Sequence, residues 1–121
     1  MLKEFLLVGG YSDSAWSEIL GSALSTIGQL DIVAQVASNE KLQQKRYDLI
    51  IVDAAGPKDI GELIVSFREQ QPDIPIIVVT TSPTWQRARQ VFLAGATDYL
   101  RKSLDKEALL ETFKAILTKQ R

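Results

Sequence analysis

Five short apolar segments alternate with five segments of helical character along this chain, and this alternation limits the folds that the chain can adopt. Three of the apolar segments consist mainly of Val, Ile and Leu without polar alternation, which is typical of strands that are buried on both faces. The second and fifth segments carry Gln35 and Asp98, and this polarity favours positions at the edges of a sheet. The strand-like segments are residues 5–8, 32–36, 49–52, 76–79 and 97–100.

The helical segments lie between and after the strands. In the first of them, Trp16 belongs to an apolar stripe with the 3.6-residue period of an α-helix, so we expect this side chain in the core. In the fourth, Ser82 is the predicted N-cap and Pro83 the first helical residue, and Gly95 follows as the predicted C-cap. The predicted helices are residues 14–27, 39–45, 59–70, 83–93 and 105–118.

Alternating strands and helices predict a parallel sheet with helices on both faces. Five strands fit the flavodoxin-like order 2-1-3-4-5, in which the second and fifth strands form the edges. We therefore predict an α/β fold, a flavodoxin-like doubly wound (βα)5 three-layer sandwich. The length of the chain predicts one domain over residues 1–121.

The composition excludes several kinds of function. The chain contains no Cys and no His, which rules out disulfides, thiolate metal sites and phosphotransfer from a histidine of the chain itself. The 14 basic and 15 acidic side chains give a net charge of −1, which argues against nucleic-acid binding through bulk charge. No apolar run approaches the roughly 20 residues that span a bilayer, and the N-terminus does not resemble a signal peptide. We therefore expect a cytoplasmic domain with neither a nucleic-acid nor a membrane partner.

Polar side chains follow three of the predicted strands, namely Asp53, Thr80 and Lys102. In a doubly wound sheet these strand ends meet at one edge, where ligands bind. A carboxylate, a hydroxyl and an ammonium in one pocket suit a carboxylate nucleophile that receives a phosphoryl group, whose oxygens the other two groups bind. Gly9 and Gly10 follow the first strand and offer no side-chain ligand. We therefore expect an ion pair between Lys102 and Asp53 at rest.

Three segments of the sequence resemble the receiver domain of bacterial two-component response regulators, and the resemblance covers nearly the whole chain. Asp53 ends the first of these segments, and Pro57 and Gly61 follow it at the spacing of the family's Pro-x-x-x-Gly pattern. The segments that carry the resemblance are residues 47–53, 75–80 and 94–102. The resemblance implies a non-enzymatic role in phosphorelay signalling, with a histidine kinase or another signalling protein as the partner.

The resemblance also implies a role for individual residues. Asp53 is the expected phosphoacceptor, Thr80 and Lys102 are expected to contact the phosphoryl group, and Tyr99 is the expected switch aromatic. Partner binding or homodimerisation is implied for the face formed by residues 83–93, 97–100 and 105–118. The interface candidates on this face are Trp85, Arg87 and Tyr99. For Trp85, packing against its own helix remains an equal alternative.

The cofactor implied by the resemblance is Mg²⁺, but two glycines stand where the family carries an acidic pair. Typical members hold the metal with that pair, the acceptor Asp and a backbone carbonyl two residues later. In this chain Gly9 and Gly10 leave only Asp53 and the carbonyl of Ala55. Because Mg²⁺ demands an octahedral set of oxygen ligands, we expect this site to be weak. Asp13 is the one alternative carboxylate that could turn into this gap, but it lies four residues past Gly9, and we assign it to the start of the first helix.

A second departure from the family pattern is Ser103, which stands where the family usually has a proline in a cis bond to the preceding Lys. A cis bond before a residue other than proline costs about 3–4 kcal/mol. We therefore predict a trans bond between Lys102 and Ser103.

Three functions remain open on the sequence alone. The first is an atypical receiver with impaired Mg²⁺-dependent phosphorylation that acts as a protein-interaction switch. The second is a fully functional receiver that a histidine kinase phosphorylates on Asp53. The third is a small nucleotide- or flavin-binding protein that uses the glycine loop of residues 9–14, because this loop joins a strand to a helix N-terminus. The dinucleotide pattern requires a third glycine, however, and Ser14 and Ala15 stand in its place.

Overall fold

Five parallel strands form one sheet in the order β2-β1-β3-β4-β5, as the sequence predicts. The computed structural model describes residues 2–119. The elements in chain order are β1 (Lys3–Val8), η1 (Gly10–Ser12), α1 (Ser14–Leu24), β2 (Gly28–Val33), α2 (Gln35–Gln44), β3 (Leu49–Asp53), α3 (Ile60–Gln70), β4 (Ile76–Thr80), α4 (Trp85–Ala94), β5 (Asp98–Arg101) and α5 (Lys106–Lys119). Within residues 2–119, no helix is long and apolar enough to span a bilayer.

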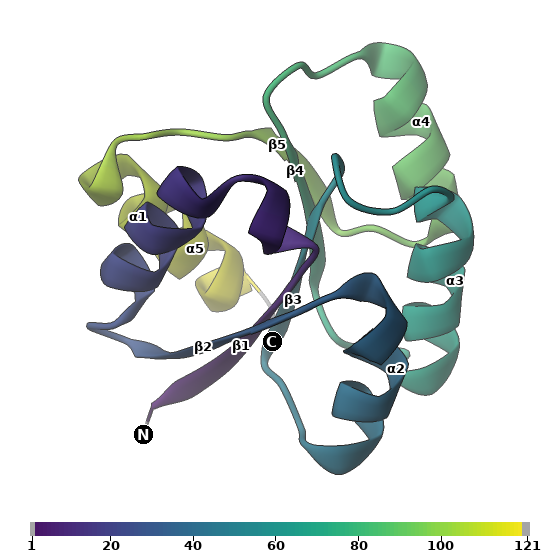
Figure 1. The fold of residues 1–121 in the computed structure, drawn as a ribbon, viewed down its shortest axis with the longest axis horizontal. Coiled ribbons are helices and arrows are strands. Elements are labelled where there is room, and N and C mark those ends of the chain that lie inside the picture. The colour runs from purple at the N-terminus through teal and green to yellow at the C-terminus, as the bar shows by residue number, and fades with distance from the viewer. Residues whose placement is uncertain (1, 120–121) are drawn as a thin grey trace.

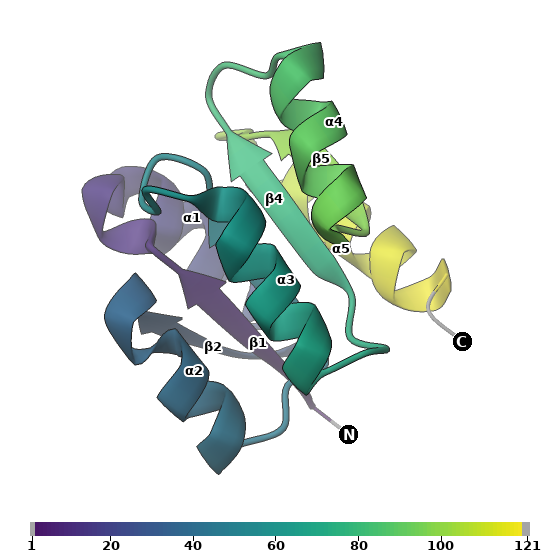
Figure 2. The same ribbon diagram turned by 90° about the vertical axis from the view of Figure 1, so that its right-hand side faces the viewer.

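Helices cover both faces of the sheet, so the chain has three layers. Helices α1 and α5 lie on one face, and α2, α3 and α4 lie on the other (Figure 1). Figure 2 shows the second face, with the arrowheads of β1 and β4 pointing to the same end of the sheet. The parallel arrangement therefore brings the loops that follow the strands together at this end.

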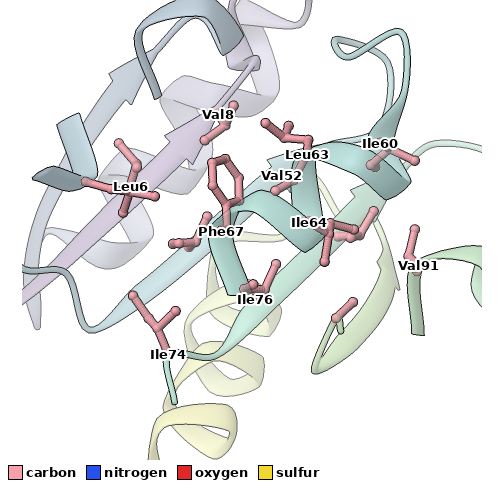
Figure 3. Close-up of a cluster of buried hydrophobic side chains, with 14 of the residues drawn as sticks. Leu6, Val8, Val52, Ile60, Leu63, Ile64, Phe67, Ile74, Ile76 and Val91 are labelled. Atoms are coloured by element: carbon pink, nitrogen blue, oxygen red, sulfur yellow. The ribbon is translucent and has the colours of Figure 1, made fainter. Parts of the chain in front are cut away.

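The two faces of the sheet form two separate cores, because successive side chains of a strand point to opposite faces. On the α3 side, Phe67 is fully buried against the strands together with Ile64 (Figure 3). The strand residues of this core are Leu6, Val8, Val33, Ile50, Val52, Ile76 and Val78. On the opposite side, Trp16 of α1 and Phe113 of α5 pack into the second core, as expected for Trp16. Its strand residues are Phe5, Leu7, Leu49, Ile51, Ile77 and Val79.

The predicted position of the second strand is wrong by several residues. The sequence predicts residues 32–36, but β2 is Gly28–Val33 and α2 already begins at Gln35 rather than at residue 39. Gly28 pairs with Lys3 of β1, and a Cβ at this glycine would collide with the Lys3 backbone. A glycine before the apolar run is therefore the actual start of the strand. The strand lies at the edge of the sheet as predicted.

The predicted N-cap of α4 is also wrong. Thr84 caps the helix, because its side-chain oxygen Oγ1 accepts a hydrogen bond from the Arg87 amide at 3.2 Å. The helix consequently begins at Trp85, and both Ser82 and Pro83 lie in the preceding loop. Gly95 is the C-cap as predicted, in a left-handed conformation with φ of 120°.

The remaining boundaries differ little from the expected ones. Helix α1 ends at Leu24 rather than at residue 27, because the Ile27 amide donates to the Leu24 carbonyl in a turn. Helices α3 and α5 each begin one residue later than expected, after Asp59 and Asp105, whose side chains accept hydrogen bonds from the first turns.

Candidate functional site

Asp53 is the last residue of β3, and its carboxylate is completely buried. One oxygen, Oδ1, accepts a hydrogen bond from the Ala55 amide at 3.0 Å. The other oxygen, Oδ2, accepts a hydrogen bond from Lys102 Nζ at 2.8 Å, so the expected ion pair is present. Because a buried charge needs partners, these two contacts explain how the carboxylate is tolerated inside the protein.

Lys102 follows β5, and its amide donates to the Thr80 carbonyl at 2.8 Å, which fixes the loop beside β4. Its ammonium bonds to Asp53 and lies 3.0 Å from Asp13 Oδ2. The same Nζ is 5.2 Å from the centre of the Trp16 ring, and the side chain is only 5% exposed. Burial lowers the pKa of Lys102, but the hydrogen bonds and charges of the two carboxylates outweigh it and raise the pKa above its usual value.

Asp13 joins the start of α1 to the pocket. Its Oδ1 accepts from the Trp16 amide at 3.2 Å, so it is the N-cap of the helix as expected. Its Oδ2 bonds to Lys102, and this hydrogen bond is the main reason that the pKa of Asp13 is lowered. The sequence indicated the capping role but not the contact with Lys102. Because a carboxylate already caps this helix, its N-terminus is poorly suited to a phosphate, which argues against the nucleotide-binding alternative.

A side chain at position 9 would point in a different direction from one at position 10. Gly9 has a left-handed φ of +84°, and a Cβ there would lie 3.5 Å from Gly56 Cα and 3.7 Å from the Asp53 carbonyl oxygen. At Gly10 a Cβ would come within 2.5 Å of a Leu7 methyl group and 2.8 Å of the Ser17 hydroxyl. A side chain at position 9 would thus face the loop after β3, whereas one at position 10 would enter the core.

A pocket of about 240 Å³ lies at this end of the sheet, beside the Asp53 carboxylate. The pocket brings together the predicted site residues Asp53, Thr80, Tyr99 and Lys102. Its wall also includes three hydroxyl side chains and one cation that the sequence did not assign to it, namely Thr81, Ser82, Thr84 and Arg87. A carboxylate, an ammonium and hydroxyls around one space are the groups needed to receive a phosphoryl group and bind its oxygens.

Tyr99 connects the pocket to α4. The ring is half-buried against the core on the α3 side, and its hydroxyl oxygen accepts from the Thr84 amide at 3.2 Å. Trp85, one residue further, is 71% exposed, which favours an interface role over packing against its own helix. The Lys102–Ser103 bond is trans as predicted, since the described residues contain no cis peptide.

The donor set fits a divalent metal poorly. Residues 2–119 contain no group of three or more Asp, Glu, His or Cys side chains able to hold a metal ion. The two carboxylates nearest the pocket, Asp53 and Asp13, both bind the Lys102 ammonium. A cation approaching them would meet this buried ammonium, and the carbonyl of Ala55 would add only one neutral oxygen.

Comparisons with known proteins all point to one family. The family model "Response regulator receiver domain" matches residues 14–114. The chain is 34% identical over 71 residues to the transcriptional regulatory protein PhoP of Escherichia coli, covering 58% of this chain and 32% of that protein. It is 30% identical over 105 residues to an uncharacterized response regulatory protein of Vibrio cholerae, covering 83% of this chain and 43% of that protein. The chain thus spans less than half of the length of these relatives.

Solved structures show the same fold. A CheY-like response regulator receiver domain protein from Methanospirillum hungatei superposes with a TM-score of 0.85 at 24% identity, covering 99% of this chain and 97% of the other. HP1043, an orphan response regulator of Helicobacter pylori, superposes with a TM-score of 0.80 at 23% identity, covering 95% and 96%. These likenesses agree with the strand order and the helix layers described above.

Proposed function

Because this chain belongs to the response regulator receiver domain family, we propose that it is an atypical receiver that acts as a protein-interaction switch without Mg²⁺-dependent phosphorylation. Receiver domains of two-component systems are signalling domains that interact with histidine kinases and other signalling proteins, and they are generally non-enzymatic.

The observation that carries the proposal is the bonding of Asp53. Both oxygens of this carboxylate are taken, one by the Ala55 amide and one by Lys102, and Lys102 also bonds to Asp13. The Lys102 ammonium thus lies beside the Asp53 carboxylate and supplies the positive charge that a bound metal would otherwise supply there. With glycines at positions 9 and 10, Asp13 is the one carboxylate that the loop after β1 supplies, and it already bonds to Lys102, so it is poorly placed to recruit a divalent cation.

The contacts around the pocket also suggest how its state reaches the surface. Thr80 and Lys102 are joined by a backbone hydrogen bond, and the Tyr99 hydroxyl holds the Thr84 amide at the start of α4. Helix α4 has one buried residue, Val91, so few core contacts oppose a shift of this helix. A change at the pocket would therefore move the N-terminus of α4.

The surface that such a shift would alter carries large apolar side chains. Three large apolar residues of α4 are exposed, namely Trp85 at 71%, Phe92 at 46% and Leu93 at 77%. Exposed aromatic and aliphatic groups of this kind favour a protein partner. We therefore place the partner or homodimer interface on α4, β5 and α5, with Trp85 as an anchor.

The test is binding of beryllofluoride, a mimic of the phosphoryl group, with and without Mg²⁺. Calorimetry measures affinity, and Trp16, whose ring lies 5.2 Å from Lys102 Nζ, reports by fluorescence. We expect Mg²⁺ to leave the affinity of the wild-type protein unchanged. Saturable binding that requires both Mg²⁺ and Asp53 would instead establish the fully functional receiver phosphorylated by a histidine kinase.

A glycine variant sharpens this test. Gly9→Asp places a carboxylate toward the loop after β3, whereas Gly10→Asp would push a side chain against Leu7 in the core. We expect Gly9→Asp to introduce Mg²⁺-dependent binding that the wild-type protein lacks. If Mg²⁺ has the same effect on both proteins, the missing carboxylate is not the reason for metal independence.

A further inference from the structure

The positive charge of Lys102 at the pocket is already neutralised by carboxylates. Lys102 bonds to Asp53 and Asp13, so the ammonium and the two carboxylates together carry one net negative charge. A phosphoryl group on or beside Asp53 would add further negative charge next to a fully buried carboxylate. Lys102 alone does not offset this charge, and a second cation is needed.

Arg87 is a cation in the wall of the same pocket. It lies in the first turn of α4 and is half-buried, and its backbone amide donates to Thr84. Within residues 2–119 its guanidinium has no hydrogen bond or ion pair, whereas Lys45, Arg68 and Lys102 all bond to oxygens. Arg87 is therefore a partly desolvated cation whose charge is not neutralised within the described fold.

The hydroxyl groups around Arg87 are also suited to an oxyanion. Thr80 Oγ1 accepts from the Ser82 amide, and Thr84 Oγ1 accepts from the Arg87 amide. A hydroxyl that accepts one hydrogen bond keeps its proton and can donate it to another oxygen. The pocket volume of about 240 Å³ is also several times the roughly 30 Å³ that one water molecule occupies in the liquid, so the pocket has room for an anion larger than water.

We propose that Arg87 is the counterion of a phosphoryl oxyanion in this pocket and takes the part of the divalent metal. Its guanidinium binds two oxygens of the group while Lys102 and the hydroxyl of Thr80 bind the others, since a planar guanidinium suits phosphate geometry. The inference rests on the proposed metal independence and adds the residue responsible for it. The ligand is either a phosphoryl group attached to Asp53 or a free phosphate, which share this chemistry.

The test uses metal-depleted buffer and two probes, beryllofluoride, which attaches to a carboxylate, and inorganic phosphate, which does not. The variants are Arg87→Gln and, as a matched control, Arg89→Gln, which removes the same charge from an exposed position of α4 outside the pocket. Asp53→Asn distinguishes the two sources of the oxyanion. Circular dichroism checks that each variant is folded.

We expect the wild-type protein and Arg89→Gln to bind beryllofluoride without metal. We expect Arg87→Gln to bind it at least about tenfold more weakly, because the variant loses a charge-assisted hydrogen bond.

Phosphate binding that survives in Asp53→Asn and requires Arg87 identifies a free anion as the ligand. Loss of all binding in Asp53→Asn identifies the attached group. Equal binding by Arg87→Gln and the wild-type protein, or no binding of either probe with or without Mg²⁺, overturns the role of Arg87 but leaves metal independence standing. Binding only with Mg²⁺ overturns both.

Discussion

Substituting Asp13 by Asn would separate its two roles, because Asn caps a helix as well as Asp but carries no charge. The variant keeps an oxygen for the Trp16 amide and loses the ion pair with Lys102. Removing one partner of a fully buried pair costs about 3–5 kcal/mol, and an exposed pair contributes about 0–1 kcal/mol. The Asp13 side chain is 32% exposed and Lys102 keeps Asp53, so we expect a loss of about 1–2 kcal/mol.

The pH dependence of this loss provides a stricter test. The pKa of Asp13 in the folded protein lies below its usual value of 3.8, so the ionised carboxylate stabilises the fold above that pH. This contribution disappears as the pH falls through the lowered pKa, and the Asn variant never has it. The difference in unfolding free energy should be largest at about pH 7 and shrink toward about pH 3. Urea unfolding followed by circular dichroism measures it at each pH.

Asp59 offers the matched control, because it caps α3 through the Glu62 amide and makes no ion pair within the described residues. Asp59→Asn should change stability by less than about 0.5 kcal/mol. If Asp13→Asn behaves like Asp59→Asn, or if its loss is the same at both pH values, the bond to Lys102 contributes no stability and the description of the resting pocket is wrong.

Three further changes test other contacts by urea unfolding and hydrogen exchange. Arg68→Met removes five hydrogen bonds to the carbonyls of Gln71, Pro72, Ile74 and Gly95, and should cost about 3 kcal/mol, because these carbonyls, most of them partly buried, lose their donor. Gly10→Asp should lower the free energy of unfolding by about 1–3 kcal/mol, because the new side chain would overpack against Leu7. A variant as stable as the wild-type protein would refute the close approach of Leu7 to this glycine. Tyr99→Phe should speed exchange of the Thr84 amide without unfolding the protein, and unchanged exchange would contradict the link to α4.

The central strands could be predicted because burial on both faces leaves a continuous apolar run in the sequence. The edge strand β2 could not be placed in this way. Val36 extends the apolar run from residue 32, yet its side chain is 95% exposed in α2. The residue that marks the start of β2 is Gly28. A glycine is needed there because the Lys3 backbone of the neighbouring strand leaves no room for a Cβ, and no local sequence pattern shows this. Edge positions are thus determined by a partner strand that the local sequence does not contain.

The pocket shows the same limit at the level of single side chains. Asp53, Thr80 and Lys102 lie at the carboxyl ends of strands, so topology alone predicts that they meet. Asp13 reaches Lys102 across 89 residues of sequence, and Arg87 lines the pocket from a helix whose start depends on Thr84. A sequence pattern assigns each of these side chains one local role, as a cap or an interface residue. Their second position follows from loop geometry, because Asp13 shares the Lys102 ammonium with Asp53 and Arg87 lies in the wall of the same pocket.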